Sequence, residues 1–229
     1  MFARSGFVDR RDAGQQLAAA LKRVTLERPV VYALPRGGVP VAAEVAAALD
    51  APLDLVLVRK IGAPGQPELA VGAVVDGVAP EVFVNRDIAR ATGADEAYFK
   101  AMEEQALREI ERRRTVYLGG RAPVSPAGCD AILVDDGVAT GASIIVAAHA
   151  LRRRDARRVI IATPVAPPDA LPRLESEADL VVCLQQPEWF PGIGAFYRDF
   201  HQLEDSEVVE LLQASAQRAT PIPVSGHGT

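Results

Sequence analysis

The sequence predicts an α/β protein in which an open, twisted, mainly parallel sheet is flanked by helices. Short apolar runs, of the kind that a strand buried on both faces requires, recur along the 229-residue chain. Stretches with helical spacing of apolar residues separate these runs, and this alternation is typical of strand–helix–strand units. At residues 131–143 an apolar run passes directly into a loop of small residues and then into a helical pattern.

The expected elements follow one another in this order: a helix with apolar residues from Ala13 to Val24, a strand at 30–34, a helix over 41–49, a strand at 53–60, two short strands at 71–75 and 81–84 joined by a turn at Asp76-Gly77, a long helix capped by Asp95 and ending near Arg114, a strand from Ala131, a helix to Leu151, and buried strands at 159–162 and 180–184. No internal repeat interrupts this order.

Net charge, apolar run lengths and cysteine spacing exclude several classes of protein function. A formal net charge of −5 argues against broad nucleic-acid binding. No apolar run reaches membrane-spanning length, and no signal-peptide core follows Met1. Cys129 and Cys183 form no Cys-x-x-Cys pattern, so we expect neither a zinc site nor disulfides and place the protein in the reducing cytoplasm.

The acid-pair loop, residues 135–143, is the most informative segment. Asp135 and Asp136 end a predicted strand, at the edge where open parallel sheets bind ligands. The small residues that follow, together with the start of the next helix, suit a phosphate. Carboxylates repel phosphate, so the pair indicates a ligand that also carries hydroxyls, such as a sugar phosphate, or a bridging divalent cation. The alternative is an ordinary glycine-rich turn with solvated acids.

Two nucleotide-binding motifs fit this loop poorly. A Walker A loop needs a lysine before its final Ser or Thr, and Ala142 stands there. A Rossmann fingerprint needs Gly-x-Gly-x-x-Gly, which residues 137–141 do not supply.

Residues 132–143 resemble the signature of the type I phosphoribosyltransferases, in which an apolar strand precedes two acids and a small-residue loop. The resemblance implies 5-phosphoribosyl 1-pyrophosphate (PRPP) as a ligand, with its ribose hydroxyls on Asp135 and Asp136. It also implies that the 5′-phosphate lies on the loop residues Gly137, Val138, Ala139, Thr140, Gly141, Ala142 and Ser143.

A second segment resembles the pyrophosphate-binding loop of the same family. A buried-type strand at 30–34 is followed by Pro35, Arg36, Gly37 and Gly38. Arginine offers a forked donor suited to phosphate, and two glycines permit a close-approach turn. Without the acid pair, such a segment is more often only a turn.

A third segment combines cations with an expected loop. Arg59 and Lys60 end the predicted strand 53–60, and residues 61–68 are rich in Gly and Pro without periodicity. Type I enzymes carry here a mobile loop that closes over the substrate, although the third basic residue of the adenine enzymes is absent. The alternative is a surface loop flanked by solvated cations.

The C-terminal segment is expected to form the family's variable hood over the acceptor base. Trp189 and Phe190 are candidates to stack on that base, or alternatively to seal the core or a subunit interface. Residues 7–14 and 196–200 also resemble a bacterial group of phosphoribosyltransferases whose acceptor is unassigned.

We therefore expect one phosphoribosyltransferase-like domain over residues 1–220, with its core at 28–184, the hood at 185–212 and a flexible tail at 221–229. The hypothesis is a Mg²⁺-dependent enzyme that transfers the phosphoribosyl group of PRPP to a purine-like or pyrimidine-like base. Its candidate catalytic residues are Asp135, Asp136, Arg59 and Lys60, and the first two are also candidate Mg²⁺ ligands beside the substrate's oxygens.

Two rival functions stay open: a catalytically silent PRPP-binding or nucleotide-binding regulator, and an enzyme that cleaves a nucleotide by phosphorolysis or hydrolysis. The acceptor, the general base and the oligomeric state are not identified by the sequence, and a homodimer is left open.

Overall fold

A computed structural model describes residues 6–76 and 80–218. Its main sheet has five strands in the order β2-β1-β6-β7-β8, and every neighbouring pair is parallel. The bounds of these strands are β1 Val30–Ala33, β2 Leu53–Leu55, β6 Asp130–Val134, β7 Arg158–Val165 and β8 Leu180–Gln185. The predicted fold class is confirmed.

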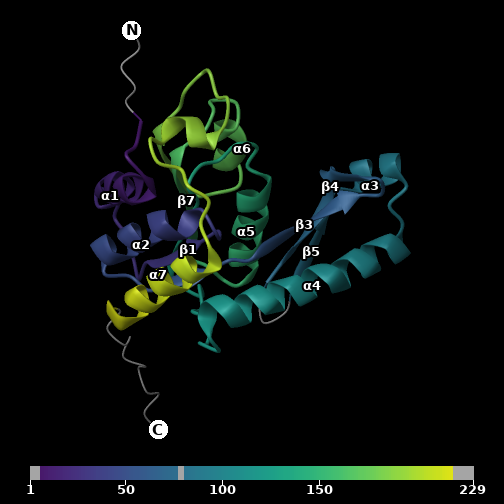
Figure 1. Cartoon of the computed structure of the whole chain (residues 1–229), viewed down its shortest axis with the longest axis horizontal. Helices are drawn as coiled ribbons and strands as arrows, with labels where there is room; N and C mark the ends of the chain where they lie inside the picture. Colours follow the sequence, from purple (N-terminus) through teal and green to yellow (C-terminus); the bar gives the residue numbers. More distant parts are fainter. Residues whose placement is uncertain (1–5, 77–79, 219–229) are drawn as a thin grey trace.

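Helices cover both faces of this sheet (Figure 1). The helices are α1 Arg10–Leu21, α2 Gly38–Leu49, α3 Arg86–Thr92, α4 Glu96–Leu118, α5 Ala142–Arg153, α6 Leu171–Glu175 and α7 Asp205–Arg218, with a short 3₁₀ helix at Ile193–Phe196. Among the described residues, no helix is long and apolar enough to cross a membrane.

The strands bury both of their faces because alternate residues point to opposite sides. On β1, Val31 and Ala33 join the apolar cluster that contains α1, α2 and α7, whereas Val30 and Tyr32 join the cluster that contains α5. The same alternation continues on β6 and β7. This explains the uninterrupted apolar runs in the sequence.

A second, three-stranded antiparallel sheet forms an arm beside the main body (Figure 1). It consists of β3 Val58–Ala63, β4 Gln66–Val75 and β5 Glu81–Val84, and α3 and α4 pack against it. The predicted short strands at 71–75 and 81–84 are therefore confirmed and do pair, although Gly77 of their predicted turn lies outside the described residues.

Two expectations for this region are wrong. The predicted strand 53–60 is two strands in different sheets, because the chain leaves the main sheet after Leu55. The predicted irregular loop at 61–68 is mostly the β3–β4 hairpin. Its pairing shifts register around Gly62, where a Cβ would lie 2.4 Å from the Pro67 carbonyl oxygen, so a bulge hides the two-residue period.

The long helix begins where the sequence predicts. Asp95 is its N-cap, and its Oδ1 accepts a hydrogen bond of 2.8 Å from the Tyr98 N–H. The helix ends at Leu118, four residues beyond the predicted end, before Gly119 in a left-handed conformation. Helix α7 begins at Asp205, near the end of the segment assigned to the hood, and the predicted tail at 221–229 lies outside the described residues.

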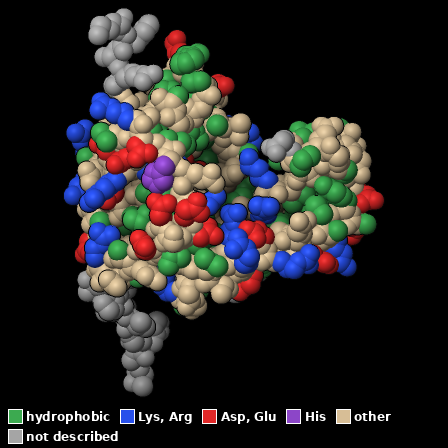
Figure 2. Space-filling model, in the orientation of Figure 1, with side chains coloured by type: hydrophobic (Ala, Val, Ile, Leu, Met, Phe, Trp, Pro, Cys, Tyr) green, Lys and Arg blue, Asp and Glu red, His purple; other side chains and the backbone are tan. Residues whose placement is uncertain are grey.

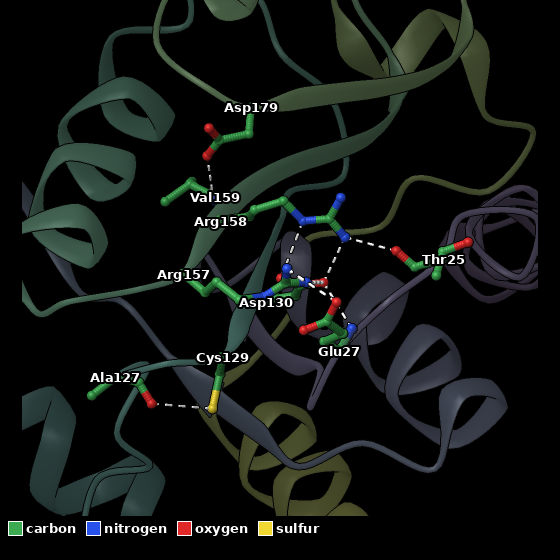
Figure 3. Close-up of polar contacts among 9 residues, drawn as sticks. All are labelled: Thr25, Glu27, Ala127, Cys129, Asp130, Arg157, Arg158, Val159 and Asp179. Carbon is green, nitrogen blue, oxygen red and sulfur yellow. Dashed lines mark hydrogen bonds and ion pairs between the residues drawn. The ribbon is translucent and has the colours of Figure 1, made fainter.

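A buried aspartate fixes the N-terminal end of β6 (Figure 3). The Asp130 carboxylate is fully buried and lies 2.6 Å from the guanidinium groups of both Arg157 and Arg158. It also accepts a 2.9 Å hydrogen bond from the Glu27 N–H. Burial by itself raises the pKa of Asp130, but the hydrogen bonds from Arg158, Glu27 and Arg157 outweigh it and hold the pKa below its ordinary value.

We expect Asp130→Asn to lower the free energy of unfolding at pH 7 by about 1–3 kcal/mol, because the arginines lose a charged partner. The folded-state pKa of Asp130 is depressed, so its stabilisation is complete above the unfolded value near pH 4 and is lost as the pH falls through the folded value. Urea unfolding of variant and wild type from pH 7 to pH 2.5 should show their difference shrinking below about pH 4.

Asp169→Asn, at an exposed aspartate, is the control and should match the wild type throughout. A difference between Asp130→Asn and wild type that does not change with pH would contradict this account.

Candidate functional site

The candidate site lies where β1 and β6 end side by side. The two strands pair in parallel from Val30↔Ala131 to Ala33↔Val134, so their following loops leave from the same edge. The Leu34 N–H donates to the Val134 carbonyl oxygen at 3.0 Å and extends the pairing by one residue. The acid-pair loop and the predicted pyrophosphate loop are therefore neighbours.

The two glycines after Arg36 let these loops touch. A Cβ on Gly37 would lie 2.1 Å from Asp136 Oδ2, and one on Gly38 would lie 2.6 Å from the Val134 carbonyl oxygen. Gly37 has helical backbone angles, with φ −57° and ψ −38°, and is the N-cap of α2. Close approach, and not an unusual φ, requires glycine at this position. The peptide bond between Pro35 and Arg36 is cis.

The acid-pair loop ends at a helix N-terminus with no side-chain cap. Gly141 has φ +78° and precedes α5, and no side chain accepts a hydrogen bond from the first turn. The unpaired N–H groups and the helix dipole favour an anion there. Upstream, the Val138 N–H donates to the Val165 carbonyl oxygen at 2.9 Å and holds the loop over the end of β7. Ala139 and Thr140 are exposed.

An arginine near the N-terminus binds the acid pair. Arg10, in the first turn of α1, donates from Nε to Asp136 Oδ2 at 2.7 Å, and both side chains are 10% exposed. Burial raises the pKa of Asp135 well above its ordinary value, and the Asp136 charge adds to this effect. Burial also raises the pKa of Asp136, while the hydrogen bond and the charge of Arg10 oppose the increase.

The segment after the 3₁₀ helix also contacts the acid pair. The Tyr197 hydroxyl donates to the Asp136 carbonyl oxygen at 2.5 Å. Arg10 Nη1 donates to the His201 carbonyl oxygen at 2.9 Å, and the Arg10 guanidinium lies 3.8 Å from the centre of the Phe200 ring. A Cβ on Gly137 would lie 2.5 Å from Ile193, so this segment lies directly on the loop.

These contacts were missed in the sequence. Residues 7–14 and 196–200 carry a family resemblance, but the resemblance assigns no role to Arg10, Tyr197 or Phe200. One weak signal was available: cations in the first turn of a helix are unfavourable for the helix dipole, but Arg10 and Arg11 both lie there, so the signal does not single out Arg10.

Two open cavities flank the acid-pair loop. The first, of about 360 Å³, has the lining residues Arg10, Arg36, Gly37, Asp136, Phe200, His201, Gln202 and Leu203. The second, of about 520 Å³, has the lining residues Ala139, Thr140, Pro167, Pro168, Asp169, Glu188 and Phe190. One cavity therefore adjoins the Arg36 turn, and the other adjoins the far side of the acid-pair loop.

The remaining candidates lie at different distances from this centre. Arg59 is exposed on β3 and shares a narrow cleft with Pro35, beside the Arg36 turn. Lys60 is exposed on the same strand and does not line that cleft. Lys and Arg side chains gather around the hollow between the main body and the arm (Figure 2).

The two aromatic candidates are placed differently. Phe190 lines the 520 Å³ cavity and stacks on Phe196, with 5.4 Å between ring centroids. Trp189 is 79% exposed and does not line that cavity.

In the part of the chain that the structure describes, no group of three or more His, Cys, Asp or Glu side chains is arranged to hold a metal ion. The acid pair supplies two carboxylates. Magnesium commonly takes only one or two protein carboxylates and completes its coordination with water and substrate phosphates, so this donor set fits a substrate-bridged Mg²⁺.

Comparison with known proteins shows which family the chain belongs to. The model of the phosphoribosyl transferase domain family matches residues 11–201. The chain belongs to this family. This phosphoribosyl transferase domain is also similar to the protein TT1426 of Thermus thermophilus, whose crystal structure superposes with a TM-score of 0.80 at 44% identity, covering 91% of this chain and 98% of that one.

Two curated Mycobacterium tuberculosis proteins, from strains CDC 1551 and H37Rv, carry the provisional name of phosphoribosyl transferase. Each is 41% identical to this phosphoribosyl transferase domain over 247 residues, covering 97% of it. The chain spans about half, 55%, of the length of these relatives.

Close packing at Gly37 predicts whether replacing this glycine by alanine stabilises or destabilises this phosphoribosyl transferase domain. The backbone angles of Gly37 suit alanine, so in open space Gly37→Ala would stabilise the fold by about 0.4–1 kcal/mol through the unfolded state. Because the Asp136 carboxylate fills that space, we expect a destabilisation of about 1–3 kcal/mol instead. Thermal unfolding measures the difference, and an unchanged or raised Tm would contradict the packing described here.

Proposed function

We propose that this chain is a Mg²⁺-dependent phosphoribosyltransferase that uses PRPP and a nitrogenous base. The observation that carries the proposal is the meeting, at one sheet edge, of an acid pair, a close-approach glycine turn and an uncapped helix N-terminus. A ligand with a diol, a pyrophosphate and a 5′-phosphate has one group for each of these three features.

The 5′-phosphate binds the loop from Gly137 to Ser143. Support comes from the uncapped first turn of α5, whose N–H groups and dipole favour an anion. The hydroxyl of Thr140 is exposed and available as a further donor. The acid pair lies immediately before this loop, where ribose hydroxyls donate to carboxylate oxygens.

The pyrophosphate binds beside Arg36, Gly37 and Gly38. The 360 Å³ cavity next to this turn contains two arginines, Arg10 and Arg36. Asp135 and Asp136 are the residues that would hold Mg²⁺ together with ligand oxygens. When bound, the ion supplies positive charge against the charge that develops on the departing pyrophosphate.

In the reaction, the bond between ribose C1 and the pyrophosphate oxygen breaks, and a bond from C1 to a ring nitrogen of the base forms. The base loses its N–H proton, and pyrophosphate leaves. The chain contributes mainly by positioning the substrates and stabilising charge. Arg59, beside the Arg36 turn, and Lys60 on the same strand are assigned to the pyrophosphate side, where their charges would act from the arm.

The acceptor base binds in the 520 Å³ cavity beyond Ala139 and Thr140. The cavity has the ring of Phe190 on its wall, and stacking on an aromatic ring is a sequence-tolerant way to hold a base. The hood segment thus lies over the loop that holds the phosphoribosyl group.

The test is direct. The protein is incubated with PRPP, Mg²⁺ and a panel of purine and pyrimidine bases, and pyrophosphate release is followed. We expect release with at least one base, and loss of PRPP affinity in the folded Asp135→Asn/Asp136→Asn double variant. Tight PRPP binding without turnover would favour the regulator. Absence of PRPP binding would overturn both the transferase and the PRPP-binding regulator. Nucleotide cleavage without transfer would favour a hydrolase or phosphorylase.

A matched pair of aromatic variants tests the acceptor cavity. Phe190→Ala should raise the acceptor KM about fivefold or more, because ring stacking on a base is worth about 1–3 kcal/mol. PRPP affinity should change little. Trp189→Ala, one residue away on a side chain that points into solvent, is the control and should leave both constants unchanged. Equal effects of the two variants would place the acceptor elsewhere.

A further inference from the structure

The acceptor cavity, the 520 Å³ cavity beyond the acid-pair loop, is built at the ends of neighbouring strands. β7 and β8 pair in parallel as far as Val165↔Gln185, and the Ala166 N–H donates to the Gln185 carbonyl oxygen at 3.1 Å. The loops after both strands therefore leave from one edge of the sheet. The loop after β7 contributes Asp169 to the cavity, and the loop after β8 contributes Glu188.

The acceptor cavity differs in charge from the cavity on the other side of the acid-pair loop. The 360 Å³ cavity beside the Arg36 turn is lined by two arginines, Arg10 and Arg36, against one carboxylate, that of Asp136. The described lining of the acceptor cavity contains Asp169 and Glu188 and no Lys, Arg or His. Because a negative wall repels an anion, this cavity suits neither a phosphate nor a ligand that carries a carboxylate.

The protein leaves both carboxylates of the acceptor cavity free. Within the described part of the chain, the side chains of Asp169 and Glu188 form no hydrogen bond or ion pair, and both residues are exposed. The acid that precedes β8 behaves differently, since Asp179 lies 3.1 Å from the Arg152 guanidinium and accepts a hydrogen bond from the Val159 N–H. The oxygens of Asp169 and Glu188 are therefore available to accept hydrogen bonds from a ligand.

The rest of the wall adds few hydrogen-bond donors. Pro167 and Pro168 have no backbone N–H. Phe190 offers its ring, and the hydroxyl of Thr140 is the one side-chain donor in the described lining. The side chains of the cavity thus offer more acceptors than donors. An amino group on a bound ring supplies the N–H donors that they lack, whereas an oxo group at the same place would leave two acceptor oxygens facing each other.

We infer that the acceptor is an uncharged nitrogen heterocycle with an exocyclic amino group, and that Asp169 and Glu188 select it by accepting hydrogen bonds from its N–H groups. This inference rests on the proposed function and specifies its acceptor. The ring of Phe190 gives affinity for any flat base, and the two carboxylates choose among bases. Bases that carry a carboxylate, or that present oxo groups to this wall, are disfavoured.

Matched pairs of bases test this selection in the wild-type protein. With PRPP and Mg²⁺ present, pyrophosphate release is measured for adenine against hypoxanthine and for cytosine against uracil, since each pair exchanges an amino group for an oxo group. In the faster pair, kcat/KM of the amino base should exceed that of the oxo base about tenfold or more, because only the amino base donates to a charged acceptor.

Carboxylated bases complete this first test. Orotate and nicotinate should give no pyrophosphate release above the reaction without a base, because their charge opposes that of the wall. A preference for the oxo base, equal values within the faster pair, or turnover of a carboxylated base would overturn the inference.

Neutral variants test the two assigned residues. Asp169→Asn/Glu188→Gln keeps the size of both side chains and adds N–H donors, so the ratio of amino to oxo kcat/KM should fall about fivefold or more. A merely structural role would lower both values together and leave the ratio unchanged. PRPP affinity should change little, because neither residue lines the cavity beside the Arg36 turn. An unchanged ratio in the double variant would overturn the assignment.

Glu175→Gln is the matched control. Glu175 is an exposed carboxylate at the end of α6 that does not line the acceptor cavity, so this variant should keep the wild-type ratio. Thermal unfolding establishes that each variant is folded. Absence of pyrophosphate release with every base would refute the proposed function itself. Turnover that favours oxo or carboxylated bases would refute the inference alone.

Discussion

The parallel pairing of β1 with β6 is the constraint on which the rest of the site depends. Parallel neighbours direct both of their following loops to the same edge, and the hydrogen bond from Leu34 to Val134 keeps the loops together past the last paired residues. The remaining separation is so small that Gly37 and Gly38 have no room for a side chain. Two segments about a hundred residues apart thereby form one surface.

Strand β6 carries aspartates at both ends, and arginines from elsewhere in the chain neutralise one at each end. Arg157 and Arg158 bind Asp130 at the start of the strand, and Arg10 binds Asp136 beyond its end. The first group stabilises a structural corner. The second lies between the sheet, the N-terminal helix and the hood, so the charge balance of the ligand site depends on segments outside the core strands.

The sequence predicted those features that depend on local pattern. The buried runs identified the parallel sheet, and the order of strand, acid pair, small-residue loop and helix identified the site edge at Asp135 and Asp136. The β3–β4 hairpin was missed because Gly, Pro and a bulge at Gly62 mask its period. Arg10 was missed because its partner is 126 residues away, and no local pattern encodes a tertiary ion pair.

The backbone hydrogen bonds between Phe7 and the segment around Phe196 and Arg198 link early and late parts of the chain. They also determine when the site is complete during synthesis. The strands that carry both loops are made before the residues after Phe196, and a domain generally folds as a unit. The Tyr197 hydroxyl can therefore reach the Asp136 carbonyl oxygen, and the His201 carbonyl oxygen can reach Arg10, only late in synthesis, so the ligand edge is complete only after the C-terminal segment has been made.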